Sequence, residues 1–176
     1  MFFIFQTVQD VEKNEPDIKE LICKYSKDVT RLCYMILKDV HLADEASWDT
    51  LYKVYKSYNN FRGDSSEKTW VTQIAINICK NYMRKSSYRE IVNSEYISLE
   101  YVSDDEALAE YKSQDSVELL NAVYNLPEKY NQVILLRYYK EMSVSEISKM
   151  LKEKNNTISV RIKRALALLK ESLKEE

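Results

Sequence analysis

Hydrophobic side chains recur at helical spacing through the first half of the chain. One predicted helix spans Ile18–Leu37, and its apolar face holds Leu21, Ile22, Tyr25, Val29, Leu32, Cys33 and Ile36. A second helix is predicted from about Leu42 to Tyr58, and its apolar and aromatic residues are Trp48, Leu51, Tyr52, Val54 and Tyr55. The first helix faces a core in this interpretation, so Cys23 and Cys33 are expected there as packing residues.

A third helix is predicted to follow the single glycine of the chain. Gly63 can take a positive φ in a turn, and either Asp64 or Ser65 can cap the helix that comes after it. Apolar residues four positions apart form one stripe along this helix, made of Trp70, Ile74, Ile78 and Tyr82. The pattern places this stripe against a core, opposite a polar side.

The helical periodicity weakens after residue 85 and returns near residue 116. The stretch between is predicted as a linker with a helical turn around Glu106–Tyr111. A helical pattern follows over Ser116–Tyr124, and Pro127 is expected at the first position of the next helix. Ser143 and Glu146 then form a capping box, which opens a short helix with three inward residues, Ile147, Met150 and Leu151.

The last helix is predicted to begin at Thr157. Its inward residues are Ile158, Ile162, Ala165, Leu166, Leu169 and Leu173. A short capped helix, a polar turn and a longer helix make a helix-turn-helix, whose second helix can lie in the major groove of DNA. Four basic residues and no acid occur between Asn156 and Lys170. This basic face could meet base edges and phosphates, or it could be the solvated face of a structural helix.

The composition supports helices throughout. One glycine and two prolines among 176 residues leave almost nothing for tight β-turns. The formal net charge of −2 hides a contrast, because residues 90–118 carry a net charge of −8 and the remainder carries +6. We therefore predict an all-α protein of two small helical domains joined by an acidic linker, the C-terminal domain being a helix-turn-helix. The expected boundaries are residues 1–88, 89–115 and 116–176.

Enzymatic and metal-binding roles find little support. His41 is the only histidine, so no His-based triad or His-pair metal site can form, and a single glycine leaves no phosphate-cradling loop. Three widely spaced cysteines fit neither a disulfide framework nor a zinc site and suit a reducing, cytoplasmic compartment. The apolar start Met1–Phe5 is too short for a signal or a membrane span. We expect no catalytic residue, no metal, no cofactor and no direct membrane insertion.

Two segments of the chain, in order, resemble one protein family. Phe61–Arg84 is similar to the pattern FRGD…TWL…IA-N…R, and Leu126–Ala165 is similar to the series LPE…VF-LR…G-S-EIA…GTV-SR-RA, with Asn156 in place of the glycine before Thr157. Both patterns occur in the extracytoplasmic-function (ECF) group of bacterial RNA polymerase sigma factors. The resemblance implies an alternative sigma factor that binds core RNA polymerase and directs promoter recognition, DNA melting and transcription initiation.

The resemblance also implies where DNA would bind. In the C-terminal domain, which would read the minus-thirty-five promoter element, the expected contacts are Thr157, Ser159, Val160, Arg161, Lys163 and Arg164. In the N-terminal domain, which would capture a flipped minus-ten base, they are Asn77, Lys80, Asn81, Arg84, Lys85, Tyr88 and Arg89.

Asn77 matches the family position at the end of IA-N and can offer amide donors and an acceptor to a base edge. Alternatively, it is a helix-surface residue or bonds to its own backbone. Tyr88, in a polar loop, is the expected stacking aromatic, whereas Trp70 and Tyr82 are expected in the core.

The second predicted helix resembles the part of the family that docks on a coiled coil of the largest polymerase subunit. The match runs over Ala43–Leu51, where Trp48 replaces the usual Gln and Ala46-Ser47 replace larger apolar residues. The residues expected to dock are Asp44, Glu45, Trp48, Asp49 and Tyr52. The implied partners are core RNA polymerase, promoter DNA and an anti-sigma factor.

Other functions remain open at this stage. A free-standing helix-turn-helix regulator could use the same C-terminal domain, but it would have no reason to carry the Asn77 segment. An anti-sigma or adaptor protein would bind only protein, which the acid-free outer face of the last helix disfavours. The acidic linker could occupy a positively lined channel of the polymerase, or it could be a solvated spacer.

Overall fold

Two helical units make up the described part of the chain. The computed structural model describes residues 18–84 and 114–174, and within these ranges the regular structure is helical, with no strand. Its elements are α1 (Ile18–Leu37), α2 (Val40–Ser57), the 3₁₀ turn η1 (Tyr58–Asn60), α3 (Glu67–Met83), α7 (Gln114–Asn125), α8 (Glu128–Ile134), the π-helical turn η2 (Leu135–Tyr139), α9 (Val144–Leu151) and α10 (Asn155–Ser172). The predicted all-α fold is confirmed, and the predicted linker lies almost wholly outside these ranges.

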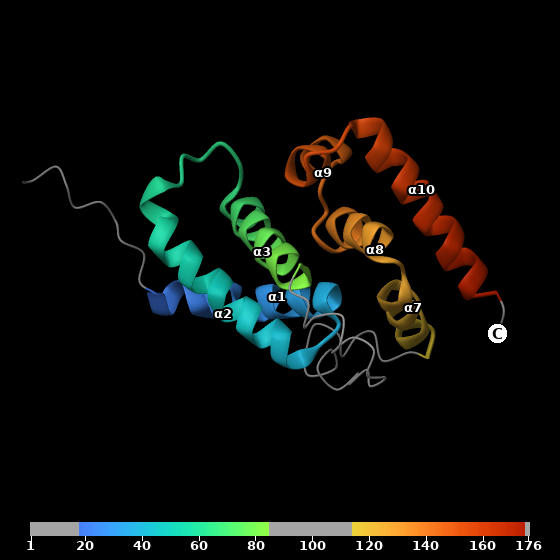
Figure 1. Cartoon of the computed structure of the whole chain (residues 1–176), viewed down its shortest axis with the longest axis horizontal. Coiled ribbons are helices and arrows are strands. Elements are labelled where there is room, and N and C mark those ends of the chain that lie inside the picture. The colour runs from blue at the N-terminus through green and yellow to red at the C-terminus, as the bar shows by residue number, and fades with distance from the viewer. Residues whose placement is uncertain (1–17, 85–113, 175–176) are drawn as a thin grey trace, which may run out of the picture.

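The N-terminal unit consists of α1, α2 and α3, which pack on one another (Figure 1). Small residues on α2, Ala43, Ala46 and Ser47, are buried and let α2 approach its neighbours closely. Ser47 shares a hydrogen bond of 2.6 Å with Thr30 on α1. Cys33 is buried as predicted, whereas the prediction for Cys23 was wrong, because its side chain is exposed.

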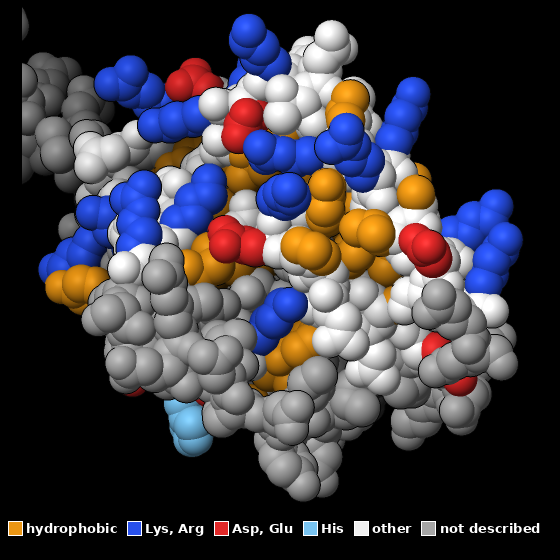
Figure 2. Space-filling view, turned by 45° about the vertical axis from the view of Figure 1, so that its right-hand side comes forward, with side chains coloured by type: hydrophobic (Ala, Val, Ile, Leu, Met, Phe, Trp, Pro, Cys, Tyr) orange, Lys and Arg blue, Asp and Glu red, His pale blue; other side chains and the backbone are white. Residues whose placement is uncertain are grey.

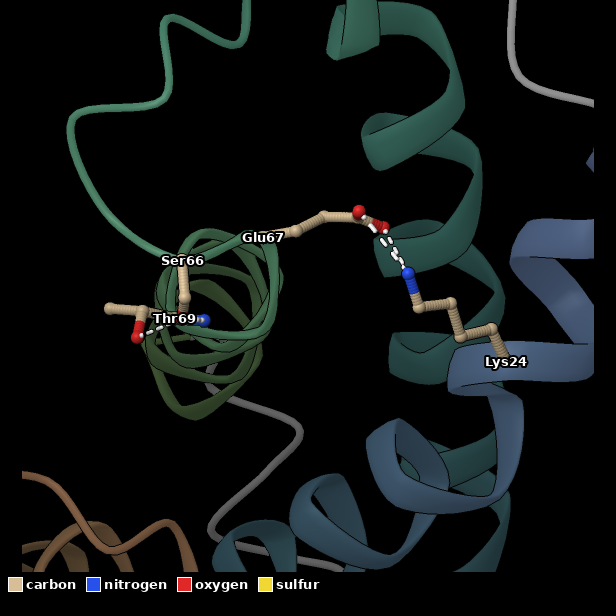
Figure 3. A network of polar contacts seen from close by, with 4 residues as sticks. All are labelled: Lys24, Ser66, Glu67 and Thr69. Atoms are coloured by element: carbon tan, nitrogen blue, oxygen red, sulfur yellow. Dashed lines mark hydrogen bonds and ion pairs between the residues drawn. The ribbon is translucent and has the colours of Figure 1, made fainter.

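Two interactions fix the beginning of α3 (Figure 3). Ser66, rather than Asp64 or Ser65, is the N-cap, and its hydroxyl accepts a hydrogen bond of 3.1 Å from the Thr69 amide. Glu67 reaches Lys24 on α1 at 3.2 Å. Gly63, just upstream, has the predicted positive φ of 73°.

The buried face of α3 lies one residue away from the predicted stripe except at Tyr82, which is buried as predicted. Val71, Ala75 and Cys79 are buried, whereas Trp70, Ile74 and Ile78 are only partly buried at the edge of the core. Trp70 instead packs with rings from the preceding turn, with centroid separations of 4.9 Å to Phe61 and 6.0 Å to Tyr58. Ile76 is also fully buried, and the buried side of the helix is the one against which α1 and α2 both pack.

The C-terminal unit contains the predicted helix-turn-helix. Ser143 and Glu146 form the capping box at the start of α9, and Ile147, Met150 and Leu151 of this helix are buried. The last helix begins at Asn155, two residues before the predicted Thr157, and Pro127 is the N-cap of α8 rather than its first residue.

The inner face of α10 is narrower than predicted. It consists of Ile158, Ile162, Ala165 and Leu169, which are buried, while Leu166 and Leu173 are more than 40% exposed. These four residues form one narrow stripe at helical spacing, and the two leucines lie beside it.

The two units lie side by side, with α8 nearer to α1 and α3 than α10 is (Figure 1). The turn between α1 and α2 meets the end of α7. There the Tyr124 hydroxyl donates a hydrogen bond of 2.9 Å to the Lys38 carbonyl, and the Lys38 ammonium lies 3.3 Å from the Leu126 carbonyl. The sequence pattern did not predict this contact between the units.

Candidate nucleic-acid interface

The polar side of α3 presents amide and basic groups. Asn77, Asn81 and Arg84 are exposed, and Lys80 is half-buried. Burial lowers the pKa of Lys80, because the charged ammonium has lost part of its water. Lys85, Tyr88 and Arg89, which were also expected near DNA, lie outside the described residues. The four described positions therefore form one stretch along the C-terminal half of α3.

Asn77 is held by a second amide on the same face. The Gln73 amide nitrogen donates to the Asn77 side-chain oxygen at 3.3 Å and lies at the same distance from the Met150 carbonyl of α9. This contact leaves the NH₂ group of Asn77 directed away from Gln73, where it can donate to another acceptor. The side chain bonds to a neighbouring side chain rather than to its own backbone. Sequence reasoning missed Gln73, although it lies one turn before Asn77.

The outer face of α10 is basic. Lys163, Arg164 and Val160 are exposed, while Thr157 and Ser159 are half-buried beside them. Arg161 is tied back by an ion pair of 2.9 Å to Glu153, in the turn before the helix. Figure 2 shows Lys and Arg side chains gathered on the upper part of this side of the molecule, around exposed hydrophobic ones. Such a surface combines charge for phosphates with apolar groups for thymine methyls.

A hollow of about 400 Å³ lies at the beginning of α10. Its lining comes from two elements and comprises Lys129, Tyr130, Asn156, Thr157, Val160, Arg161 and Arg164. The N-cap residue Lys154 makes no side-chain capping bond. Lys129, Arg161 and Arg164 give the hollow a positively charged lining, and the positive end of the α10 dipole lies at the same end of the helix, which suits an anionic group.

The exposed face of α2 is aromatic and acidic. Trp48 and Tyr52 are 62% and 60% exposed and lie one turn apart, with Glu45 and Asp49 exposed near them and Asp44 half-buried. Asp49 accepts a hydrogen bond of 2.8 Å from the hydroxyl of the buried Tyr82. Burial and this carboxylate raise the pKa of Tyr82. An aromatic pair this exposed is typical of a protein-binding surface.

A polar cluster joins the two units, and no sequence motif indicated it. The Lys140 ammonium lies 2.6 Å from one oxygen of Asp28, and the Tyr139 hydroxyl donates to the other at 2.9 Å. Burial works against the charged carboxylate of Asp28, but Lys140 and Tyr139 hold its pKa below the usual range. Burial lowers the pKa of Lys140, an effect that Asp28 opposes. Asp28 and Lys140 lie too far apart in the chain for any local pattern to pair them.

Other kinds of site are not apparent in the described ranges. Within residues 18–84 and 114–174, no three His, Cys, Asp or Glu side chains come together as a metal site would require. None of the helices described is both long and apolar enough to span a membrane.

Comparison with known proteins gives two family matches and relatives over almost the whole chain. The model for sigma-70 region 2 matches residues 21–89, and the model for sigma-70 region 4 matches residues 116–169. The ECF RNA polymerase sigma factor SigW of Bacillus subtilis is 27% identical over 98% of this chain and 97% of its own length. The RNA polymerase sigma-H factor of Pseudomonas aeruginosa is also 27% identical, over 97% of this chain and 92% of its own length.

Two solved structures share the fold. One is the sigma factor RpoE in complex with the anti-sigma factor NepR from Bartonella quintana, with a TM-score of 0.69, 23% identity and coverage of 89% of this chain and 96% of that chain. The other is CnrH in complex with the cytosolic domain of CnrY, with a TM-score of 0.61, 16% identity and coverage of 90% and 88%.

Proposed function

The chain belongs to the sigma-70 family, in its extracytoplasmic-function group, and on this premise we propose how its surfaces divide the recognition of a promoter. It is an alternative sigma factor that directs RNA polymerase to promoters. The region 4 unit reads the minus-thirty-five element with α10. The region 2 unit captures the minus-ten strand with α3 and docks on the polymerase with α2. The polymerase performs nucleotide transfer, and the chain acts beside it in the cytoplasm.

The observation that carries this proposal is the two-sided character of α10. Its inner face is buried on α8 and α9, so the helix is held rigidly, and its outer face exposes Lys163 and Arg164 with no acid between Asn156 and Lys170. Duplex DNA binds such a surface through phosphate neutralisation and through base contacts from the first turns of the helix. Thr157, Ser159 and Val160 lie in those turns.

The face of α3 suits a strand that has left the duplex. Asn77 and Asn81 supply hydrogen-bonding groups that can pair with the edge of an unstacked base, while Lys80 and Arg84 are placed for its phosphates. Lys85, Tyr88 and Arg89 follow directly in the chain and complete the proposed surface. Trp70 is packed against Phe61 and Tyr58, so it is not the stacking platform for the base.

Two proteins are proposed as partners. Core RNA polymerase would bind the exposed face of α2, where Trp48 and Tyr52 supply apolar area and Asp44, Glu45 and Asp49 supply negative charge. An anti-sigma factor would bind the free chain, a proposal that rests on the shared fold with RpoE and CnrH, which were solved with such regulators.

Run-off transcription from genomic fragments tests the proposed function. Core polymerase alone should give no specific transcript on a fragment that carries a cognate promoter, and adding the chain should produce one of defined length. Trp48→Ala should reduce this transcript by lowering affinity for core, whereas Lys27→Ala, on the exposed surface of α1, should leave it unchanged. Specific DNA binding by the chain without any core-dependent transcript would instead support a free-standing regulator.

A further inference from the structure

The two units make polar contacts that must break when the chain spans a promoter. This argument rests on the proposed function. Elements centred at minus ten and minus thirty-five lie about 85 Å apart along B-DNA, given a rise of about 3.4 Å per base pair. In the structure the units touch, and the Lys80 side chain of α3 lines a common hollow of about 410 Å³ with Glu153 and Arg161 at the beginning of α10. This closed arrangement cannot read both elements at once.

We propose that Asp28, Tyr139 and Lys140 form a latch that holds the free chain closed and limits its entry into promoter complexes. The two carboxylate oxygens of Asp28, on α1, each contact one residue of the other unit. One oxygen forms an ion pair of 2.6 Å with Lys140, and the other accepts a hydrogen bond of 2.9 Å from Tyr139. The Lys140 side chain is only 3% exposed, so it depends on this carboxylate for compensation of its charge.

A π-helical turn in the region 4 unit orients the side chains of Tyr139 and Lys140 toward α1. The helix that begins at Glu128 changes at Leu135 to a π-helical turn, in which the Lys140 amide donates to the Leu135 carbonyl at 2.9 Å. The extra residue in such a turn rotates the side chains that follow it, and π-turns are found frequently at functional sites. Tyr139 and Lys140 thereby face Asp28, while Tyr138 next to them remains 55% exposed.

The position of the latch makes it reversible. A buried charge that loses its partner inside a core has no access to water and destabilises the fold. Lys140 lies at a contact between two units that each have their own buried residues, so separation of the units returns both Lys140 and Asp28 to water. The other contacts between the units include one more charged group, the Lys38 ammonium near the Leu126 carbonyl, and the hydrogen bonds of Tyr124 and Gln73. Each of these contacts uses a backbone carbonyl as acceptor, so none of them pairs two opposite charges as Asp28 and Lys140 do.

The first experiment measures the shape of the full chain by small-angle X-ray scattering. Asp28→Asn and Lys140→Met should raise the radius of gyration by roughly 5 Å, because two compact units of about 10 Å each move apart. Tyr139→Phe removes the hydrogen bond from the hydroxyl to Asp28 but leaves Asp28 paired with Lys140, so it should give a smaller rise. Because it unpairs no buried charge, this variant should stay folded even if the other two do not. Tyr138→Phe, in the same turn, and Lys149→Met, on the exposed face of α9, are the controls and should match the parent.

The second experiment measures promoter binding with core polymerase. At limiting chain, Asp28→Asn should form complexes roughly tenfold faster on a duplex that carries both elements, because a larger fraction of the chain is open. A radius of gyration unchanged from the parent in all three latch variants would overturn the latch. A larger radius with an unchanged rate would overturn its link to promoter entry. If the parent gives no transcript with core, the proposed function fails, but the scattering still decides whether the latch exists.

Discussion

The two candidate reading helices present different kinds of chemical group. The outer face of α10 presents exposed cations, Lys163 and Arg164, beside Ser159 and Val160. The polar face of α3 presents mainly neutral amides, with Asn77 held by Gln73, and its cations are the half-buried Lys80 and the exposed Arg84 at the end of the helix. Cations attract the phosphates of any duplex, whereas amides discriminate through short, directional hydrogen bonds. The difference indicates that α10 supplies affinity for duplex DNA and that α3 acts on a base that has already been exposed.

The helices also differ in how they are anchored at their beginnings. Ser66 caps α3, and the neighbouring Glu67 pairs with Lys24 of α1. Burial and the Glu67 carboxylate raise the pKa of Tyr25 to about 12, so its hydroxyl stays protonated and available to that carboxylate. In α10 the side chain of the N-cap residue Lys154 makes no hydrogen bond to the first amides of the helix. A helix that binds phosphates at its beginning gains from this lack of a side-chain cap.

The largest expected effect comes from breaking the anchor of α10. Ile158 is fully buried, so Ile158→Ala should lower the free energy of unfolding by about 2–5 kcal/mol through lost burial and a cavity. Val160→Ala, two residues away and 47% exposed, should change it by less than about 0.5 kcal/mol. Chemical denaturation of the full chain measures both. Equal losses for the two variants would contradict the assignment of inner and outer faces.

A smaller effect is expected at the outer face of the same helix. Arg164→Ala should weaken binding of the polymerase complex to a minus-thirty-five duplex by roughly 1–3 kcal/mol if Arg164 reaches a base. A phosphate contact would weaken all sequences alike and reduce the salt dependence of binding. Lys170→Ala, at the far end of α10, is the matched control. Titrations at several salt concentrations, on cognate and scrambled duplexes, would show no role for Arg164 if both variants match the parent.

Much of the fold was predictable because its helices follow local rules. The range of α1, the turn at Gly63 and the capping box at Ser143 depend on residues within a few positions of each other. The buried face of α3 was predicted correctly at Tyr82 and wrongly at Trp70, which packs on aromatic rings at the edge of the core. The core instead receives residues such as Val71, Ala75 and Ile76, on the side of α3 that faces α1 and α2. The spacing of hydrophobic residues shows which side chains could be buried. It does not show which face of the helix the neighbouring helices will cover.

The sequence motifs predicted which residues of the candidate site are exposed, but not which residues contact them. Lys163 and Arg164 face outward as the helical pattern requires, and Asn77 is exposed at its expected position on α3. The partner of Asn77, Gln73, and the latch between Asp28 and Lys140 were not predicted, because these contacts depend on how two distant segments pack. The role of the acidic linker stays a prediction, since most of it lies outside the described residues.

The central claim is that α3 reads an exposed strand and α10 reads duplex DNA, and crossed binding of two variants tests it most directly. Fluorescence anisotropy would compare Asn77→Ala and Arg164→Ala, each bound to core polymerase, on a single-stranded minus-ten oligonucleotide and on a minus-thirty-five duplex. Asn77→Ala should lose roughly 1 kcal/mol on the single strand alone, the typical contribution of one hydrogen bond, and Arg164→Ala should lose affinity for the duplex alone. Loss of affinity by both variants for the same DNA, or by neither for either DNA, would contradict the account.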